Sequence, residues 1–206
     1  GWHDLKAAFP GYHVANRGIG GDTSRGLLFR FHEDVIDLEP AAIVLLIGGN
    51  DLSAHASPEG IASNIDAAIA KVKSHNPTTP IALCTLPPRD SKTAPTKPGA
   101  QARLNELIRE LSEKHENIAL IDLHPLLALP DGMPDMHYFS EDRLHLGPKA
   151  YEVWQAAVQE FVAKRAPVDE RTKPRRAEDW IDPATSAAAD IAYPQEAAAI
   201  AEPTTS

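Results

Sequence analysis

Short apolar runs alternate with longer amphipathic stretches from residue 1 to about residue 165. The strand candidates among the short runs are 12–15, 41–47, 81–86 and 118–123. The second of them, AAIVLLI, is continuously apolar, which is the pattern of a strand that a sheet buries on both faces. The sequence therefore predicts four strands, fewer than a parallel sheet of this kind usually contains.

Between the strand candidates, apolar residues recur at helical spacing in 24–38, 57–72, 102–114 and 150–162. The second helix has a clear start, because Ser57 can cap it and Pro58 suits its first turn. Strands that alternate with helices indicate parallel pairing through right-handed crossovers. The predicted fold is therefore an α/β parallel sheet.

The composition changes at residue 166. The segment 166–206 is rich in alanine and proline and keeps no amphipathic period. Such a segment cannot bury enough apolar surface to dock on a core. We expect one globular domain at 1–165, followed by a disordered or loosely attached tail at 166–206.

Charge and composition exclude several classes of protein. The formal net charge is −9, which argues against a partner that is a nucleic acid or an anionic membrane. No apolar run approaches the roughly 18 residues of a membrane span. Cys84, the single cysteine, stands in an apolar run and is expected to be a small buried residue rather than a nucleophile.

Three polar motifs stand where an α/β fold places its active site, near the carboxyl ends of strands. Asn16–Thr23 (NRGIGGDT) follows the first strand candidate, and Gly48–Asp51 (GGND) follows the AAIVLLI run. Asp142–His145 (DRLH) precedes the last helix. Because the carboxyl ends of parallel strands share one edge of a sheet, we expect these motifs to converge.

Each motif has a chemical interpretation and a structural one. A serine esterase needs a histidine base and a carboxylate that fixes its tautomer, and a tight turn can bring Asp142 onto His145. Asn50 can aim a side-chain N–H at an oxyanion, and the glycine-rich turn offers backbone N–H groups to an anion. Taken singly, each motif could equally be structural. DRLH could be a helix start with an incidental histidine, GGND an ordinary turn, and NRGIGGDT a tight strand-to-helix connection. A phosphate or nucleotide site at the glycine-rich turn is a further alternative, but it leaves Asn50 and the Asp142/His145 pair unexplained.

A metal site is a weaker interpretation of the same region. Asp135, His137, Asp142 and His145 could be imagined as ligands, but their spacing is irregular and the chain has no His-Glu-x-x-His. No metal is therefore expected.

Together, NRGIGGDT, GGND and DRLH resemble blocks II, III and V of the SGNH hydrolases, the GDSL-like esterases and lipases. The resemblance spans residues 1–164 and is nearest the branch that includes the platelet-activating-factor acetylhydrolase catalytic subunits. It implies a three-layer α/β/α, flavodoxin-like fold with strand order 2-1-3-4-5. It also implies that Gly21 and Asn50 are oxyanion donors and that Asp142 and His145 are the catalytic pair. The implied substrates are small lipid, sugar or aryl esters with a short acyl group such as acetyl, and no cofactor is implied.

The chain departs from the family at block I, the Gly-Asp-Ser that carries the nucleophile. Ser24 in GDTS is superficially similar, but Gly21 and Asp22 already belong to block II and Ser24 enters a helix. Gly1-Trp2 looks like the segment that follows block I, so we expect the first strand and its serine just before Gly1. Residues 1–206 alone are then expected to be inactive. The alternative is a catalytically silent SGNH-like binding module that lacks the serine.

Overall fold

A parallel sheet of three strands forms the centre of the fold in the computed structural model, which describes residues 4–90 and 92–167. The strands are β1 (Ile43–Leu45), β2 (Ile81–Cys84) and β3 (Ile118–Ile121), in the spatial order β1-β2-β3. All pairs are parallel, with Ile81 aligned to Ile43 on one side and to Ile118 on the other. The predicted α/β class is confirmed, although each strand is shorter than its apolar run.

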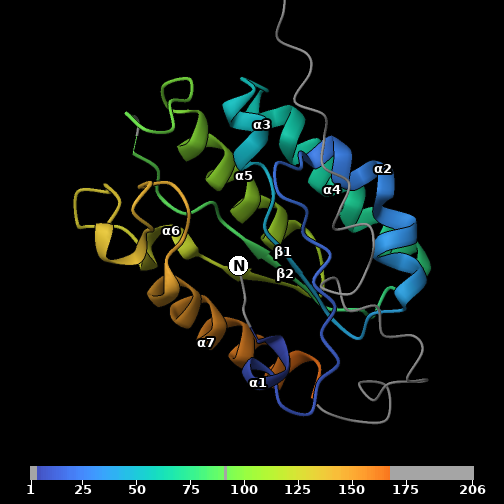
Figure 1. The fold of residues 1–206 in the computed structure, drawn as a ribbon. Helices are drawn as coiled ribbons and strands as arrows, with labels where there is room; N and C mark the ends of the chain where they lie inside the picture. The colour runs from blue at the N-terminus through green and yellow to red at the C-terminus, as the bar shows by residue number, and fades with distance from the viewer. Residues whose placement is uncertain (1–3, 91, 168–206) are drawn as a thin grey trace, which may run out of the picture. The chain divides into compact units, whose positions relative to one another are not determined.

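Helices connect and cover these strands (Figure 1). The four longest agree closely with the predicted ones: α2 (Ser24–Asp34), α4 (Pro58–His75), α5 (Ala100–Lys114) and α7 (Pro148–Arg165). Shorter elements are α1 (Leu5–Ala8), α3 (Gly49–Ser53), α6 (Leu123–Leu126) and the 3₁₀ turns η1 (Ile36–Leu38) and η2 (Met136–Tyr138).

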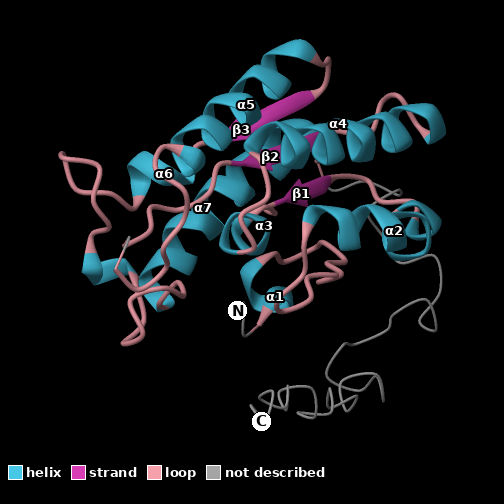
Figure 2. Cartoon of the chain, turned by 90° about the horizontal axis from the view of Figure 1, so that it is seen from above, coloured by secondary structure: helices cyan, strands magenta, loops and turns pink. Residues whose placement is uncertain are grey.

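The side chains of β2 divide the core into two clusters. Ile81 and Leu83 belong to the cluster that contains the apolar faces of α2, α4 and α5. Ala82 and Cys84 belong to the cluster that contains α1 and α7. Because successive side chains of a strand point to opposite faces, this alternation places one helix layer on each side of the sheet, as Figures 1 and 2 show. The three-layer prediction is confirmed.

The start of α4 forms as its sequence predicts. The Ser57 hydroxyl oxygen accepts a hydrogen bond from the Gly60 N–H at 3.2 Å, and Pro58 occupies the first turn. Proline costs nothing there, because the first N–H groups of a helix have no intrahelical acceptor. The rest of the helix buries Ile61, Ile65 and Ile69 against the core.

The predicted strand at 12–15 is wrong, since this segment is irregular. Tyr12 and Val14 pack against the cluster of α1 and α7, whereas His13 and Ala15 are exposed, so the period of two is retained. A strand also needs main-chain pairing with a neighbour, and periodicity alone cannot supply it.

Two further expectations need correction. The predicted helix at 24–38 breaks at Val35, and η1 follows it. The AAIVLLI strand is not buried on both faces, because Val44 in β1 is 36% exposed. β1 is an edge strand of the three-stranded sheet, and an edge strand has fewer neighbours to cover it.

The tail predicted at 166–206 lies, from residue 168 onward, outside the described residues. Ala166 itself is buried and caps the end of α7 through its N–H, which donates to the Val162 carbonyl. Of the helices that are described, none is both long and apolar enough to span a membrane.

Candidate active site

Asp142 and His145 are bonded to each other within one tight turn. The His145 Nδ1 lies 2.5 Å from Asp142 Oδ2. The other carboxylate oxygen accepts hydrogen bonds from the backbone N–H groups of Leu144 and His145, both at 3.0 Å. The hydrogen bond from His145, supported by these two N–H groups, lowers the pKa of Asp142 to about 2. Asp142 is therefore ionised at neutral pH and fixes the proton of a neutral His145 on Nδ1.

The other ring nitrogen of His145 remains available. The His145 side chain is 77% exposed. Within the described residues, its only side-chain partner is Asp142 through Nδ1, so Nε2 has no hydrogen-bonded partner. With the proton held on Nδ1, the Nε2 lone pair can accept a proton from a hydroxyl group. This is the arrangement that a general base requires.

Main-chain pairing on either side holds the turn in place. Phe139 and Leu146 form an antiparallel bridge, and the Ser140 N–H donates to the His145 carbonyl at 2.8 Å. The Gly147 N–H donates to the Tyr138 carbonyl at 2.7 Å. A Cβ at Gly147 would lie 3.3 Å from the backbone of Phe139, so the close approach of these two segments favours glycine.

The GGND motif forms the start of α3. Gly48 adopts φ of 115°, and a Cβ there would lie 2.9 Å from Leu104 Cδ2 and 3.1 Å from Ile61 Cγ2. Both the backbone conformation and the packing therefore require glycine at this position. The sharp turn that results places Asn50, an exposed residue, in the first turn of the helix just beyond β1.

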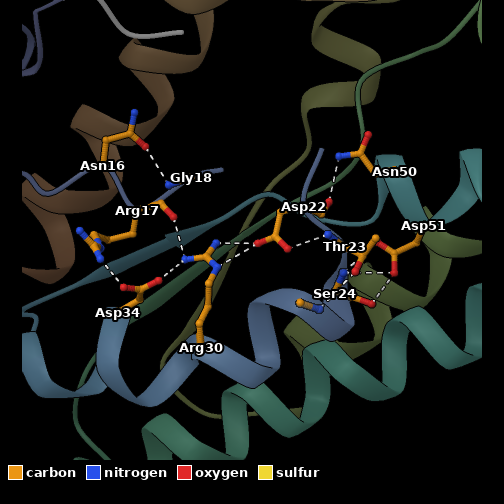
Figure 3. A network of polar contacts seen from close by, with 11 residues as sticks. Asn16, Arg17, Gly18, Asp22, Thr23, Ser24, Arg30, Asp34, Asn50 and Asp51 are labelled. Atoms are coloured by element: carbon orange, nitrogen blue, oxygen red, sulfur yellow. Dashed lines mark hydrogen bonds and ion pairs between the residues drawn. The ribbon is translucent and has the colours of Figure 1, made fainter. Parts of the chain in front are cut away.

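Asn50 also bonds directly to the NRGIGGDT loop. Its Nδ2 donates to the backbone carbonyl of Asp22 at 2.8 Å (Figure 3). A primary amide carries two N–H donors, so this bond orients the side chain and leaves the second N–H free to bind another acceptor.

Gly21 stands beside Asp22 in that loop. Its φ is 79°, and nothing lies within 4 Å of a Cβ built on it, so its backbone conformation rather than lack of space favours glycine. Gly21 is exposed, and among the described residues no acceptor is hydrogen-bonded to its N–H. Of the two predicted oxyanion donors, Gly21 thus lies in a loop whose next residue, Asp22, is bonded to Asn50 in the first turn of α3.

Charged residues of α2 clamp the NRGIGGDT loop (Figure 3). The Arg30 guanidinium donates to Asp22 Oδ2 through Nε and Nη2, at 3.1 and 2.6 Å. Its Nη1 donates to the Arg17 carbonyl at 2.9 Å and to Asp34 Oδ2 at 2.6 Å, and Asp34 also pairs with Arg17. Burial by itself would raise the pKa of Asp34, but the hydrogen bonds from Arg30 and Arg17 lower it overall. These ion pairs therefore remain charged at neutral pH, and they fix the backbone around Gly21.

Ser24 is a structural residue, as its position at a helix start suggests. It is 2% exposed, and its Oγ donates to Asp51 Oδ1 at 2.7 Å. The carboxylate of Asp51, which is 5% exposed, also accepts from the Ser24 N–H, and Asn64 donates to the Ser24 Oγ at 2.9 Å. This buried network joins the starts of α2 and α3 to α4.

Pro87-Pro88-Arg89 resembles the region before the substrate loop of SGNH hydrolases, but sequence reasoning missed Asp90 and the contacts that Arg89 and Asp90 make beyond β2. Arg89 donates to the Gly49 carbonyl at 2.7 Å and to the Ser53 Oγ at 2.8 Å, and so holds α3. Its neighbour Asp90 forms an ion pair of 3.0 Å with Arg143 of the DRLH turn. Consecutive residues therefore bond to the GGND and DRLH motifs. The only signal in the sequence was a charged pair that follows a buried strand and two prolines.

The residues imagined as a metal cluster separate into two unrelated groups. The Asp135 carboxylate accepts from the His137 N–H, and His137 Nε2 lies 2.6 Å from Lys149 Nζ. Asp142 and His145 bond to each other instead. Cys84 is 2% exposed, and burial raises the pKa of its thiol to about 12, which agrees with the expected small buried residue.

Comparison with known proteins identifies the family to which this fold and site belong. The sequence profile of the GDSL-like lipase/acylhydrolase family matches residues 1–153. The chain therefore belongs to this family, and the resemblance to SGNH hydrolases is confirmed.

Individual relatives agree. The chain is 30% identical to platelet-activating factor acetylhydrolase IB subunit alpha2 of Rattus norvegicus over 151 residues. These residues make up 73% of this chain and 63% of that protein. The chain thus spans somewhat less than two thirds of the length of these curated relatives. A lipase/acylhydrolase structure from Enterococcus faecalis is 25% identical with a TM-score of 0.61, covering 76% of this chain and 75% of the other. A GDSL-like lipase structure from Bacteroides thetaiotaomicron is 24% identical with a TM-score of 0.63, covering 72% and 74%, and supports the fold.

Proposed function

We propose that the protein is a serine ester hydrolase that cleaves carboxylic esters through an acyl-serine intermediate. The observation that carries the proposal is the Asp142–His145 pair, in which Nδ1 is bonded to an ionised carboxylate at 2.5 Å and Nε2 is left open. A histidine in this state is prepared to remove a proton from a hydroxyl group.

Each site residue has one role in this mechanism. His145 takes the proton of the serine as the hydroxyl attacks the ester carbonyl, and returns it to the departing alcohol. Asp142 stays ionised and stabilises the imidazolium that forms in between. The Gly21 N–H, the free N–H of Asn50 and the N–H of the serine itself would bind the oxyanion of the tetrahedral intermediate.

The proposed nucleophile is the serine of a Gly-Asp-Ser block, which residues 1–206 do not contain. Ser24 is committed to Asp51 and Asn64, and the thiol of Cys84 is buried and protonated. Within the described residues, no serine, threonine or cysteine side chain is hydrogen-bonded to the His145 ring. The resemblance of the chain to blocks II, III and V of the SGNH hydrolases, a family in which block I carries the serine, supports this proposal.

The proposed substrates are small esters with a short acyl group such as acetyl, carried by a lipid, sugar or aryl alcohol. The relatives that are named platelet-activating factor acetylhydrolase subunits support the acetyl preference. The mechanism uses only side chains and backbone N–H groups, so it requires no cofactor.

A chain-length series tests the proposal. The protein, expressed with its N-terminal Gly-Asp-Ser segment, should hydrolyse p-nitrophenyl acetate and butyrate faster than the decanoate, and a phosphonate ester should inactivate it with one label per chain. The same protein with that serine changed to Ala is the control. A folded protein that binds the esters but neither turns them over nor takes up the label would support the alternative, a catalytically silent binding module.

A further inference from the structure

The DRLH turn contains one residue in an unusual backbone conformation. Arg143 has φ of 59°, a left-handed conformation that residues other than glycine, asparagine and aspartate adopt uncommonly. Such a conformation persists only where the surrounding structure enforces it. Since Arg143 stands between Asp142 and His145, whatever enforces its conformation also shapes the pair.

A buried carboxylate adds to the backbone bonds of the turn, in which the Arg143 N–H donates to the Ser140 carbonyl at 2.9 Å. Asp90 is 4% exposed, and its Oδ2 lies 3.0 Å from the Arg143 guanidinium. A buried charge is strongly disfavoured unless it is paired, so Asp90 favours the contact with Arg143. Thr93 adds a weaker contact, because its Oγ1 lies 3.5 Å from the Arg143 carbonyl.

Asp90 itself is fixed by its own turn. Its Oδ1 accepts from the Lys92 N–H at 2.9 Å, and its carbonyl accepts from the Ala94 N–H at 2.8 Å. The residue before it, Arg89, bonds to the Gly49 carbonyl next to Asn50. The segment after β2 therefore connects the turn that carries His145 to the helix that carries Asn50.

We propose that Asp90 and Arg143 are positioning residues, whose ion pair holds the Asp142–His145 turn in the geometry that keeps the imidazole proton on Nδ1. Neither residue needs to touch the substrate. The inference rests on the proposed function, because positioning matters to catalysis only if His145 is the base. The hydrogen bond itself can be measured without any substrate.

Nitrogen-15 NMR of the histidine rings tests the proposal on the whole chain at a pH where the imidazoles are neutral. In the wild type, His145 should carry its proton on Nδ1, and this proton should exchange slowly with water. In Asp90→Asn and Arg143→Asn, the Nε2–H tautomer should become populated and the exchange should accelerate by about ten-fold or more, as loss of a charge-assisted hydrogen bond predicts. The double variant should resemble either single variant, because both remove the same ion pair.

The controls separate positioning from a general effect on stability. Asparagine tolerates the left-handed conformation, and Arg143 is more than half exposed, so Arg143→Asn should fold even if Asp90→Asn does not. His115, paired with Asp66 at 2.6 Å between α4 and α5, should keep its signals in every variant. Arg103→Ala, which removes an exposed arginine with three carboxylate partners, should leave the His145 signals unchanged.

Two results would overturn the inference: folded Arg143→Asn with the wild-type tautomer and exchange rate, or a wild type in which His145 shows no preference for Nδ1–H. If the tautomer depends on Asp90 but the protein with its serine hydrolyses no ester, the positioning role stands and the proposed function fails. If the protein is an esterase, Arg143→Asn should lower kcat while KM holds, and Arg143→Lys should restore part of the loss.

Discussion

The side-chain amide of Asn50 donates a hydrogen bond to the backbone carbonyl of Asp22 at 2.8 Å. This bond joins the GGND and NRGIGGDT motifs through two residues that are 28 positions apart in the chain (Figure 3). It also sets the direction of the remaining Asn50 N–H. Asn50 thus has two tasks in the proposed site, to anchor the loop that carries Gly21 and to bind the oxyanion beside it.

Replacement of Asn50 should therefore reduce turnover more than binding. In Asn50→Ala we expect kcat to fall on the order of 10²–10³-fold with little change in KM, the typical cost of one oxyanion donor. Steady-state kinetics with p-nitrophenyl acetate measures both constants. A raised KM with unchanged kcat would mean that Asn50 binds the substrate equally in its ground and transition states.

Ser24 should prove to be a structural residue. Ser24→Ala removes the hydroxyl that bridges Asp51 and Asn64, so we expect the free energy of unfolding to fall by about 1–3 kcal/mol. Esterase turnover by the folded variant should remain near that of the wild type. Urea denaturation and an activity assay measure the two quantities. Loss of turnover by 10³-fold or more, with stability intact, would instead identify Ser24 as the nucleophile.

Asp142 should contribute to stability in a pH-dependent way. Its pKa is lowered from 3.8 to about 2 in the folded protein, so its contribution is fully present above pH 3.8 and is lost as the pH falls through 2. Asp142→Asn should therefore be less stable than the wild type at pH 7, and most of this difference should be gone at pH 2. Unfolding of both proteins at the two pH values checks this. An equal difference at both values would show that the carboxylate charge is not involved.

How much of the fold the sequence predicts depends on whether local signals suffice. The helix α4 could be predicted to within a residue at its start, because Ser57, Pro58 and the isoleucine spacing all act locally. The strand at 12–15 could not be excluded, since its alternation is real but strand formation depends on a partner elsewhere in the chain. Likewise, the exposure of Val44 depends on the position of β1 in the sheet rather than on its own sequence.

The candidate site also contains one feature that the local sequence predicts and others that depend on distant residues. The Asp142–His145 pair could be predicted, because the two residues stand three positions apart and lie within reach of each other across a single tight turn. The contacts that join the motifs to one another could not. Asp90 and Arg143 are 53 positions apart in the chain, and Arg89 and Gly49 are 40 apart. Nothing in a local pattern indicates which distant charge a buried carboxylate will pair with.

The segment beyond α7 should be dispensable. Residues 168–206 lack the apolar periodicity that docking on a core requires, whereas Ala166 still packs at the end of α7. A chain that ends at residue 167 should keep its melting temperature and its turnover. Thermal unfolding of the two chains measures this, and a fall of many degrees on truncation would show that the segment packs.

Kinetic comparison of two histidine variants tests the central claim most directly. His145 and His115 are each bonded to an aspartate, at 2.5 and 2.6 Å. His115 follows the end of α5 and its partner Asp66 belongs to α4, so neither is part of the three motifs. In the protein that includes the Gly-Asp-Ser segment, His145→Ala should lower kcat for p-nitrophenyl acetate by roughly 10³-fold or more, as loss of a triad base does, while His115→Ala should stay near the wild type. A folded His145→Ala variant that retains most of the wild-type kcat would contradict the account.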